Sequence, residues 1–167
     1  GQAQLHDGAA ILVVAGVAKI DGLTLAPPEG AFYAYIGCAG LIGRRTPKGT
    51  VLADDTAVVD YLLAEGHLGS VPGAAYGLSP FFRISTATSD EVLTEAISRI
   101  ARAVAQAVPN GCSLFINIGT TTEAIARELL RHQGLRVITN NLNVAAILSD
   151  NPDCEVIVAG GLVRSRD

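Results

Sequence analysis

The most regular feature of the sequence is an apolar stripe in the middle of the chain. From Ser89 to about Ala107, apolar residues recur three or four positions apart, at Leu93, Ile97, Ile100, Val104 and Val108. Because an α-helix has about 3.6 residues per turn, this spacing places all five side chains on one face. The pattern therefore predicts a long amphipathic helix, which the Pro-Asn-Gly sequence at 109–111 should end.

The patterns before this helix mix strands and helices. A weak helical period extends to about residue 20, and a second helix is predicted over 55–65, with Gly66 as its expected C-terminal stop. Aromatic and β-branched residues predict strands at 31–36, 68–71 and 81–85. Residues 37–48 are rich in glycine and arginine, which is typical of a surface loop. Residues 1–105 are therefore expected to form an α+β segment.

The pattern changes after residue 111. Strand-like runs at 114–118, 136–138 and 155–158 alternate with helix-like runs at 123–131 and 142–148. Short loops between alternating strands and helices are typical of a parallel sheet with crossover helices. The predicted fold class is therefore α/β: the α+β segment is followed by a parallel βαβαβ, Rossmann-like segment over residues 106–167.

Charge and composition narrow the classes of partner. The net charge is −4, and no basic cluster exceeds Arg44-Arg45, which argues against direct binding of nucleic acid. No apolar run approaches the roughly 20 residues of a membrane-spanning helix. Three widely spaced cysteines predict reduced thiols in a cytoplasmic setting, and the three histidines match no metal-ligand spacing.

Arg83 is the chemically informative residue of the first segment, because it is a single guanidinium within the apolar strand Phe-Arg-Ile-Ser at 82–85. A guanidinium in such a setting needs a partner, and its planar fork matches a carboxylate. That carboxylate could belong to an internal acid such as Asp60 or Glu95, or to a ligand. The sequence leaves both alternatives open.

Three motifs and the helix after them make a family resemblance. Pro-Glu-Gly-Ala-Phe-Tyr at 28–33, Val-Pro-Gly-Ala-Ala-Tyr-Gly at 71–77 and Phe-Arg-Ile-Ser at 82–85 occur in order. Over about residues 13–105 the chain resembles the C-terminal part of the small domain of class I, pyridoxal-phosphate-dependent aminotransferases of the aspartate aminotransferase type. The resemblance implies that Arg83 holds the substrate α-carboxylate and that Phe32 lies near the substrate entrance.

The same resemblance implies pyridoxal phosphate as the cofactor, which the family binds through a Schiff-base lysine and a large domain. The only lysines are Lys19 and Lys48, and neither has the sequence context of that residue. No catalytic residue is therefore assigned, and no turnover is expected from this chain alone.

A second group of candidate residues follows the strand at 114–118. Glycine, three hydroxyls and a helix occur in succession in Gly-Thr-Thr-Thr-Glu at 119–123. A helix N-terminus that follows a close backbone turn favours an anion. The alternative is simple helix capping by Thr120 and Glu123. Polar clusters after the next two strands are expected at the same sheet edge, where open α/β sheets bind ligands.

These clusters carry a second resemblance. Ile-x-Ile-Gly-Thr-Thr-Thr-Glu, Val-Ile-Thr-Asn-Asn-Leu-Asn-Val-Ala and Val-Ala-Gly-Gly-x-x-Arg occur in order between 116 and 164. Over about residues 100–167 the chain resembles the effector-sensing domain of DeoR-type repressors of the glycerol-3-phosphate-regulon type. The resemblance is expected to cover about the first half of that domain. The resemblance implies a sugar-phosphate site formed by Gly119, Thr120, Thr121, Thr122, Asn140, Asn141, Gly161 and Arg164.

The sequence thus predicts a composite: an aminotransferase small-domain fragment, joined near 101–108 within one helix to a truncated phosphosugar sensor. The expected partners are small anions, namely an amino-acid carboxylate and a sugar phosphate, and a homo-oligomer is compatible with this reading. In one alternative, the second segment determines the function, and the chain is the effector-binding part of a DeoR-family transcriptional repressor that recognises a sugar phosphate. Another is a non-functional chimeric fragment with exposed apolar surfaces.

Overall fold

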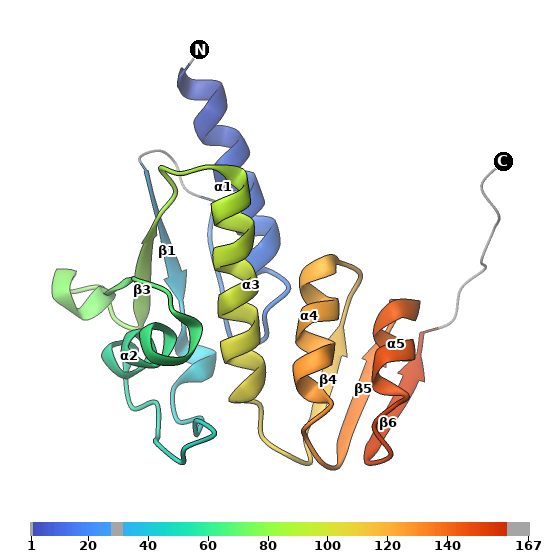
Figure 1. Cartoon of the computed structure of the whole chain (residues 1–167). Helices are drawn as coiled ribbons and strands as arrows, with labels where there is room; N and C mark the ends of the chain where they lie inside the picture. Colours follow the sequence, from blue (N-terminus) through green and yellow to red (C-terminus); the bar gives the residue numbers. More distant parts are fainter. Residues whose placement is uncertain (1, 28–31, 160–167) are drawn as a thin grey trace, which may run out of the picture. The chain divides into compact units, whose positions relative to one another are not determined.

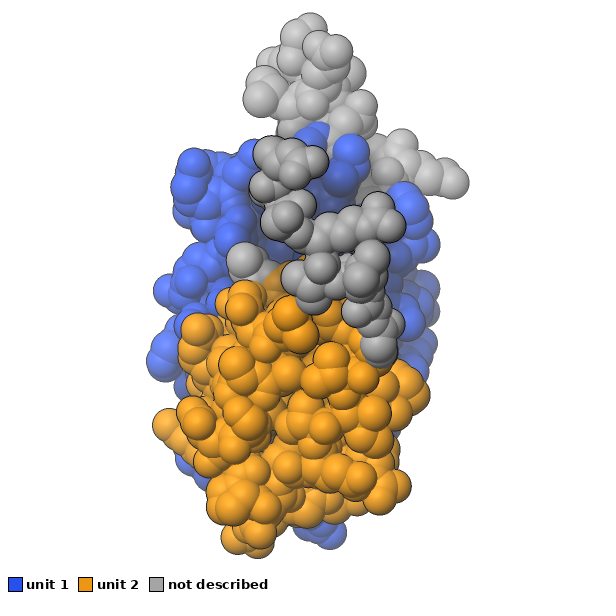
Figure 2. All heavy atoms as spheres, turned by 90° about the vertical axis from the view of Figure 1, so that its right-hand side faces the viewer, with its two compact units in different colours: residues 1–108 blue, residues 109–167 orange. Residues whose placement is uncertain are grey.

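The computed structural model describes residues 2–27 and 32–159 of the 167-residue chain. The chain divides into two compact units, Gly1–Val108 and Pro109–Asp167, which are drawn in different colours in Figure 2. Each unit has its own sheet, so each is described separately (Figure 1).

Unit 1 consists of helices around a small antiparallel sheet (Figure 1). Its strands pair in the order β1-β3-β2, so that β3 is central. In chain order its elements are α1 (Gln2–Val17), β1 (Tyr33–Gly37), the 3₁₀ turn η1 (Ala39–Leu41), α2 (Asp55–Gly66), β2 (Val71–Pro72), the 3₁₀ turn η2 (Gly73–Tyr76), β3 (Phe81–Ser85) and α3 (Asp90–Gln106).

The two longer strands of unit 1 have one buried and one more exposed face. Ala34, Ile36, Phe82 and Ile84 are buried, whereas the alternate residues of both strands, apart from the buried Gly37 at the end of β1, are exposed or half-buried. Successive side chains of a strand point to opposite faces, so this alternation separates a core face from a polar face. Arg83 pairs with Tyr35 across the sheet and therefore lies on the polar face.

Helix α3 confirms the central prediction of the sequence. All five residues of the predicted stripe are buried, and the Ser89 hydroxyl caps the helix by accepting from the backbone N–H of Val92. Helices α1 and α2 both contact α3. The contact with α2 includes a buried hydrogen bond of 2.8 Å from the Tyr61 hydroxyl to the carbonyl oxygen of Ala103. Burial raises the pKa of Tyr61 to about 12, with a smaller contribution from Glu65.

The end of α2 differs from the expectation. Gly66 is still helical, and the left-handed position that terminates the helix is taken by His67, with φ of 51°. A side chain at positive φ is unfavourable, which is why glycine was expected to mark this position. The His67 carbonyl oxygen accepts a hydrogen bond from Arg99 on α3, which helps to hold this turn against the long helix.

Unit 2 is the predicted parallel βαβαβ segment (Figure 1). Its strands pair in the order β4-β5-β6, all parallel, and α4 contacts α5. The order follows the chain, as expected for successive crossover connections. Its elements are β4 (Ser113–Ile116), α4 (Thr120–Leu129), β5 (Leu135–Thr139), α5 (Leu142–Leu148) and β6 (Cys154–Val158).

Part of the sheet of unit 2 is exposed and apolar. Phe115, Ile138 and Ile157 are in register on the three strands, and Phe115 is 78% exposed. A parallel sheet is ordinarily covered on both faces. The exposed apolar surface that the fragment alternative requires is thus present in unit 2.

Two classes of feature are absent from the described residues. No group of three or more histidine, cysteine, aspartate or glutamate side chains is arranged to hold a metal ion there. Among the same residues, no helix combines the length and the apolar character needed to cross a membrane.

Candidate carboxylate-binding and anion-binding sites

Arg83 lies among three tyrosines on the polar face of the antiparallel sheet. Its guanidinium carbon is 4.4 Å from the ring centroid of Tyr33 on β1 and 4.5 Å from that of Tyr76 on η2. A hydrogen bond to the Tyr35 side chain is the main cause that raises the pKa of Arg83. Aromatic contacts of this kind stabilise a guanidinium while leaving in-plane N–H groups available for a planar anion.

The internal acids that were considered as partners of Arg83 are engaged elsewhere or do not pair with it. Glu95 forms ion pairs with Arg99 at 2.8 Å and Arg102 at 3.1 Å, both along α3. Among the residues that the structure describes, no carboxylate, including that of Asp60, forms an ion pair with Arg83. The guanidinium is therefore held by aromatic side chains, and the internal salt-bridge alternative is wrong for these two acids.

Phe32 precedes β1 and is 46% exposed. Its carbonyl oxygen accepts from the backbone N–H of Thr86, and its side chain lines an open pocket together with Ser89 and Asp90 at the start of α3. The structure thus places Phe32 at an accessible surface of unit 1. Its predicted role beside a substrate entrance stays a prediction. Residues 28–31, the rest of its motif, lie outside the described residues.

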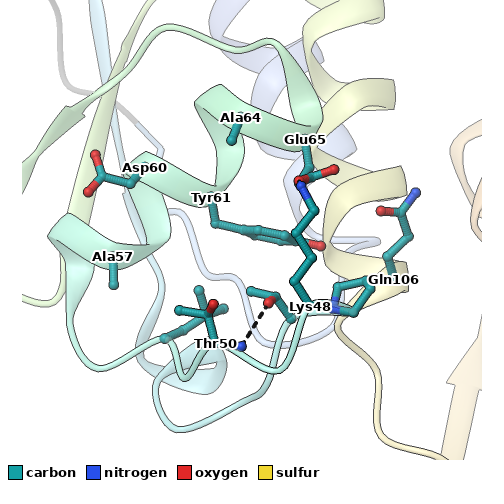
Figure 3. A pocket seen from close by; sticks show the side chains of 11 residues that line it. Lys48, Thr50, Ala57, Asp60, Tyr61, Ala64, Glu65 and Gln106 are labelled. Carbon is teal, nitrogen blue, oxygen red and sulfur yellow. Dashed lines mark hydrogen bonds and ion pairs between the residues drawn. The ribbon is translucent and has the colours of Figure 1, made fainter.

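The two lysines have no environment that fits a Schiff base. Lys19 is exposed just after α1. Lys48 extends from its loop to Glu65 on α2, where its ammonium group lies 2.5 Å from the carboxylate (Figure 3). The ion pair occupies the Lys48 ammonium group, whereas a Schiff-base lysine needs an amine that is free to react. Neither lysine therefore fits the cofactor chemistry.

Lys48 and Glu65 also border a pocket of about 340 Å³ that the sequence analysis did not anticipate (Figure 3). Its walls come from the loop around Thr46–Thr50 and from one face of α2, including Ala57, Tyr61 and Ala64. None of the predicted site residues lines it. No sequence signal marked this pocket, because it forms where a loop folds over a helix.

The turn between β4 and α4 has the geometry of a glycine-dependent helix start. Gly119 is the N-cap residue, with φ of 154° and ψ of 152°, a conformation that is essentially restricted to glycine. Gly119 has no side chain that could cap the helix, and the capping box of Thr120 and Glu123 stays a prediction, because the Thr120 side chain lies outside what the structure describes. The Glu123 carboxylate accepts a hydrogen bond of 2.9 Å from Asn143 on α5.

The Thr122 side chain is buried, and its hydroxyl donates to the carbonyl oxygen of Gly119. This hydroxyl therefore stabilises the turn itself. The backbone N–H groups of Thr122 and Glu123 also point back to the Gly119 carbonyl. The anion-binding roles of Gly119, Thr120 and Thr121 remain predictions.

Thr139, at the end of β5, joins the ends of all three parallel strands. Its hydroxyl donates to the Ile116 carbonyl on β4 at 2.6 Å and accepts from the backbone N–H of Asn141 at 3.0 Å. Its own carbonyl oxygen accepts from the backbone N–H of Ala159, just after β6. The carboxyl ends of the strands are thus held together, as the sequence analysis expected.

The other predicted sensor residues differ in their surroundings. Asn141 is buried and caps α5, since its side-chain oxygen accepts from the backbone N–H groups of Asn143 and Val144. Asn140 is exposed beside it. Gly161 and Arg164 lie outside the described residues. Of these residues, Asn140 is therefore accessible at the end of β5, while Asn141 is engaged in capping α5.

Comparison with known proteins assigns the first part of the chain. Residues 3–100, more than half of the chain, match the family described as aminotransferase class I and II, and the chain therefore belongs to that family over this range. It is 55% identical over 92 residues to an aspartate aminotransferase of Rhizobium meliloti, which covers 55% of this chain and 22% of that protein. A crystal structure of the aspartate aminotransferase from the same organism superposes with a TM-score of 0.62 at 48% identity, covering 63% of this chain and 26% of that one.

The second part matches a different family. Residues 94–167 match the DeoR C-terminal sensor domain, and the two family matches overlap at residues 94–100, inside α3. The glycerol-3-phosphate regulon repressor of Escherichia coli is 58% identical over 74 residues, which are 44% of this chain and 29% of that protein. The chain thus spans about a fifth to a third of the relatives it matches, and it joins parts of two of them.

These matches confirm both resemblances. Full-length aminotransferases of this family use pyridoxal phosphate. In the chain described here, neither lysine fits that group, so no chemical step is assigned to it. Arg83 with its tyrosines is the candidate carboxylate site of unit 1, and of these residues the sequence predicted the arginine alone.

Proposed function

We propose that unit 1 is the carboxylate-binding part of an aminotransferase, with Arg83 as the group that holds the α-carboxylate of an amino acid. The observation that carries the proposal is the guanidinium of the half-buried Arg83, which contacts two tyrosine rings and forms no ion pair with a described acid. The family match over residues 3–100 supports the same role.

Titration of the full chain with L-aspartate, followed by NMR, tests this function. Replacing Arg83 with glutamine should weaken binding by about 10- to 100-fold, because hydrogen bonds to charged groups contribute roughly 1.5–3 kcal/mol. The affinity of Arg83→Lys for L-aspartate should lie between those of wild type and Arg83→Gln, because lysine keeps the charge but lacks the planar guanidinium. Arg99→Gln, which removes a cation paired with Glu95 on α3, is the matched control and should bind as wild type does.

The ligand supplies a second control. Isoasparagine, in which an amide replaces the α-carboxylate of aspartate, should bind wild type weakly and show no further loss with Arg83→Gln. Equal affinity of wild type and Arg83→Gln for L-aspartate would refute the proposal.

For unit 2 we propose recognition of a sugar phosphate at the turn before α4. The glycine-restricted conformation of the N-cap residue Gly119 supports it, together with the similarity to the glycerol-3-phosphate regulon repressor. In this proposal the phosphate binds at the helix N-terminus, where backbone N–H groups and the helix dipole favour an anion.

A titration with glycerol 3-phosphate tests the second proposal. Thr121→Val should weaken binding about threefold to tenfold, the effect of one lost hydrogen bond of roughly 0.5–1.5 kcal/mol. Glycerol, which lacks the phosphate, should bind wild type and Thr121→Val with the same affinity. Thr94→Val, on the exposed surface of α3, is the control. Equal affinity of wild type and Thr121→Val for glycerol 3-phosphate would remove this threonine from the site.

A further inference from the structure

Asp55 is a buried acid that the sequence analysis did not single out. Asp55 is the first residue of α2, and it is only 1% exposed. A buried carboxylate must be compensated by hydrogen bonds. One of its oxygens accepts from the backbone N–H of Ala74 in η2, at 2.9 Å and across 19 residues of sequence.

The two neighbouring aspartates have different tasks. Asp54 caps its own helix, because it accepts from the backbone N–H of Ala57 at 2.9 Å. Asp55 supplies an acceptor to the first turn of η2. That turn needs one, since its N-cap residue is Pro72, which makes no side-chain cap. The first N–H groups of a helical turn lack partners within the turn.

The turn that Asp55 holds carries Tyr76. η2 contacts both α2 and β3, and the ring of Tyr76 lies 4.5 Å from the guanidinium carbon of Arg83. Tyr76 is 52% exposed, so little packing of its own holds the ring in place. Its position depends on the backbone of η2, and that backbone is fixed at Ala74 by Asp55.

Strand pairing fixes the backbone of Arg83 but not the end of its long side chain. The register with Tyr35 and Val71 sets where the chain leaves the sheet. Several rotatable bonds remain, and ordering them on ligand binding lowers affinity. Contacts with Tyr33 and Tyr76 reduce this freedom before a ligand arrives.

We infer that Asp55 is a positioning residue for Arg83: through Ala74 and η2 it holds Tyr76 against the guanidinium and so orders the carboxylate-binding group. This inference rests on the proposed function of Arg83 for its functional meaning. The ordering itself is a property of the free protein and can be measured without a ligand.

The test uses the ring-current shift of the Arg83 side-chain Hδ and Hε resonances in the full chain. Asp55→Ala should move these resonances toward their positions in Tyr76→Leu, which removes the ring. Asp55→Asn should leave them near wild type, because its side-chain oxygen still accepts from Ala74. Asp54→Ala is the matched control: it removes the adjacent carboxylate and helix cap but should not shift Arg83.

The same variants are then titrated with L-aspartate. Asp55→Ala should weaken binding about threefold to tenfold, whereas Asp55→Asn should stay within twofold of wild type. A wild-type protein that fails to bind L-aspartate contradicts the proposed function and leaves the resonance shifts to decide the role of Asp55. Arg83 resonances that are unchanged in folded Asp55→Ala overturn that role.

A measurement on wild type covers the case in which Asp55→Ala does not fold. The Ala74 amide is at an exposed residue of a short turn, and only the Asp55 hydrogen bond should protect it from hydrogen exchange. Protection of this amide by at least tenfold relative to an unstructured peptide supports the inference. Exchange at the unprotected rate overturns it.

Discussion

Phe82→Ala should lower the free energy of unfolding of unit 1 by about 4 kcal/mol, within the range measured for deleting a buried aromatic ring. Phe82 is completely buried on the central strand β3, where it is in register with Ile36 on β1 and Pro72 on β2. The loss combines the transfer free energy of the ring with a cavity that rigid strands on both sides cannot fill.

The measurement is selective, because all four tyrosines lie between residues 33 and 76 and the chain has no tryptophan. Near-ultraviolet circular dichroism of tyrosine in a urea titration therefore follows unit 1. Phe82→Leu should cost less than half as much, since it retains most of the apolar volume. Phe115→Ala, at an exposed position of unit 2, should leave this transition unchanged. A loss below about 1 kcal/mol for Phe82→Ala would contradict the assignment of Phe82 to the core.

Periodicity alone was sufficient for most of the fold. The stripe on α3 and the alternation in unit 2 identified elements whose bounds in the structure differ by a few residues at most. Both patterns arise because elements of a fold bury apolar residues, and the spacing of apolar residues in the sequence shows which positions are buried. The left-handed turn at His67 was not predictable in this way, because contacts with α3 hold a residue other than glycine there.

The sites were predictable only in part, for a related reason. Arg83 was identified because a cation within an apolar strand is conspicuous in the sequence. Its tyrosine neighbours were not, since Tyr33 and Tyr76 are 43 residues apart and meet the guanidinium only through sheet register and the fold of η2. Asp55 was missed because its partner is a backbone N–H, which leaves no signature in residue type.

The chain joins parts of two families, so local sequence patterns predict its elements better than the fold of either whole family does. α3 can continue from one family into the other because an amphipathic helix requires only that its apolar stripe stay in phase. The family matches overlap at residues 94–100, within that stripe. Phe115, which follows the helix in unit 2, is 78% exposed.

Gly73→Ala should have the second largest effect, a loss of about 3 kcal/mol in the free energy of unfolding of unit 1. A Cβ atom at this position would lie 1.8 Å from the carbonyl oxygen of Leu78 and 2.8 Å from that of Phe81. Both are main-chain atoms and cannot rotate away. The backbone N–H of Leu78 also donates to the Gly73 carbonyl at 2.9 Å, which closes the loop around η2.

The steric origin of this effect is separable from the general cost of replacing a glycine. Gly69→Ala is the matched control, because its Cβ would meet nothing within 4 Å, and it should change the stability by no more than about 0.5 kcal/mol. Displacing η2 must also displace Tyr76, so Gly73→Ala should shift the Arg83 resonances and Gly69→Ala should not. Equal unfolding midpoints for the two variants would show that η2 tolerates the added methyl group, and the tight packing that holds Tyr76 over Arg83 would then be refuted.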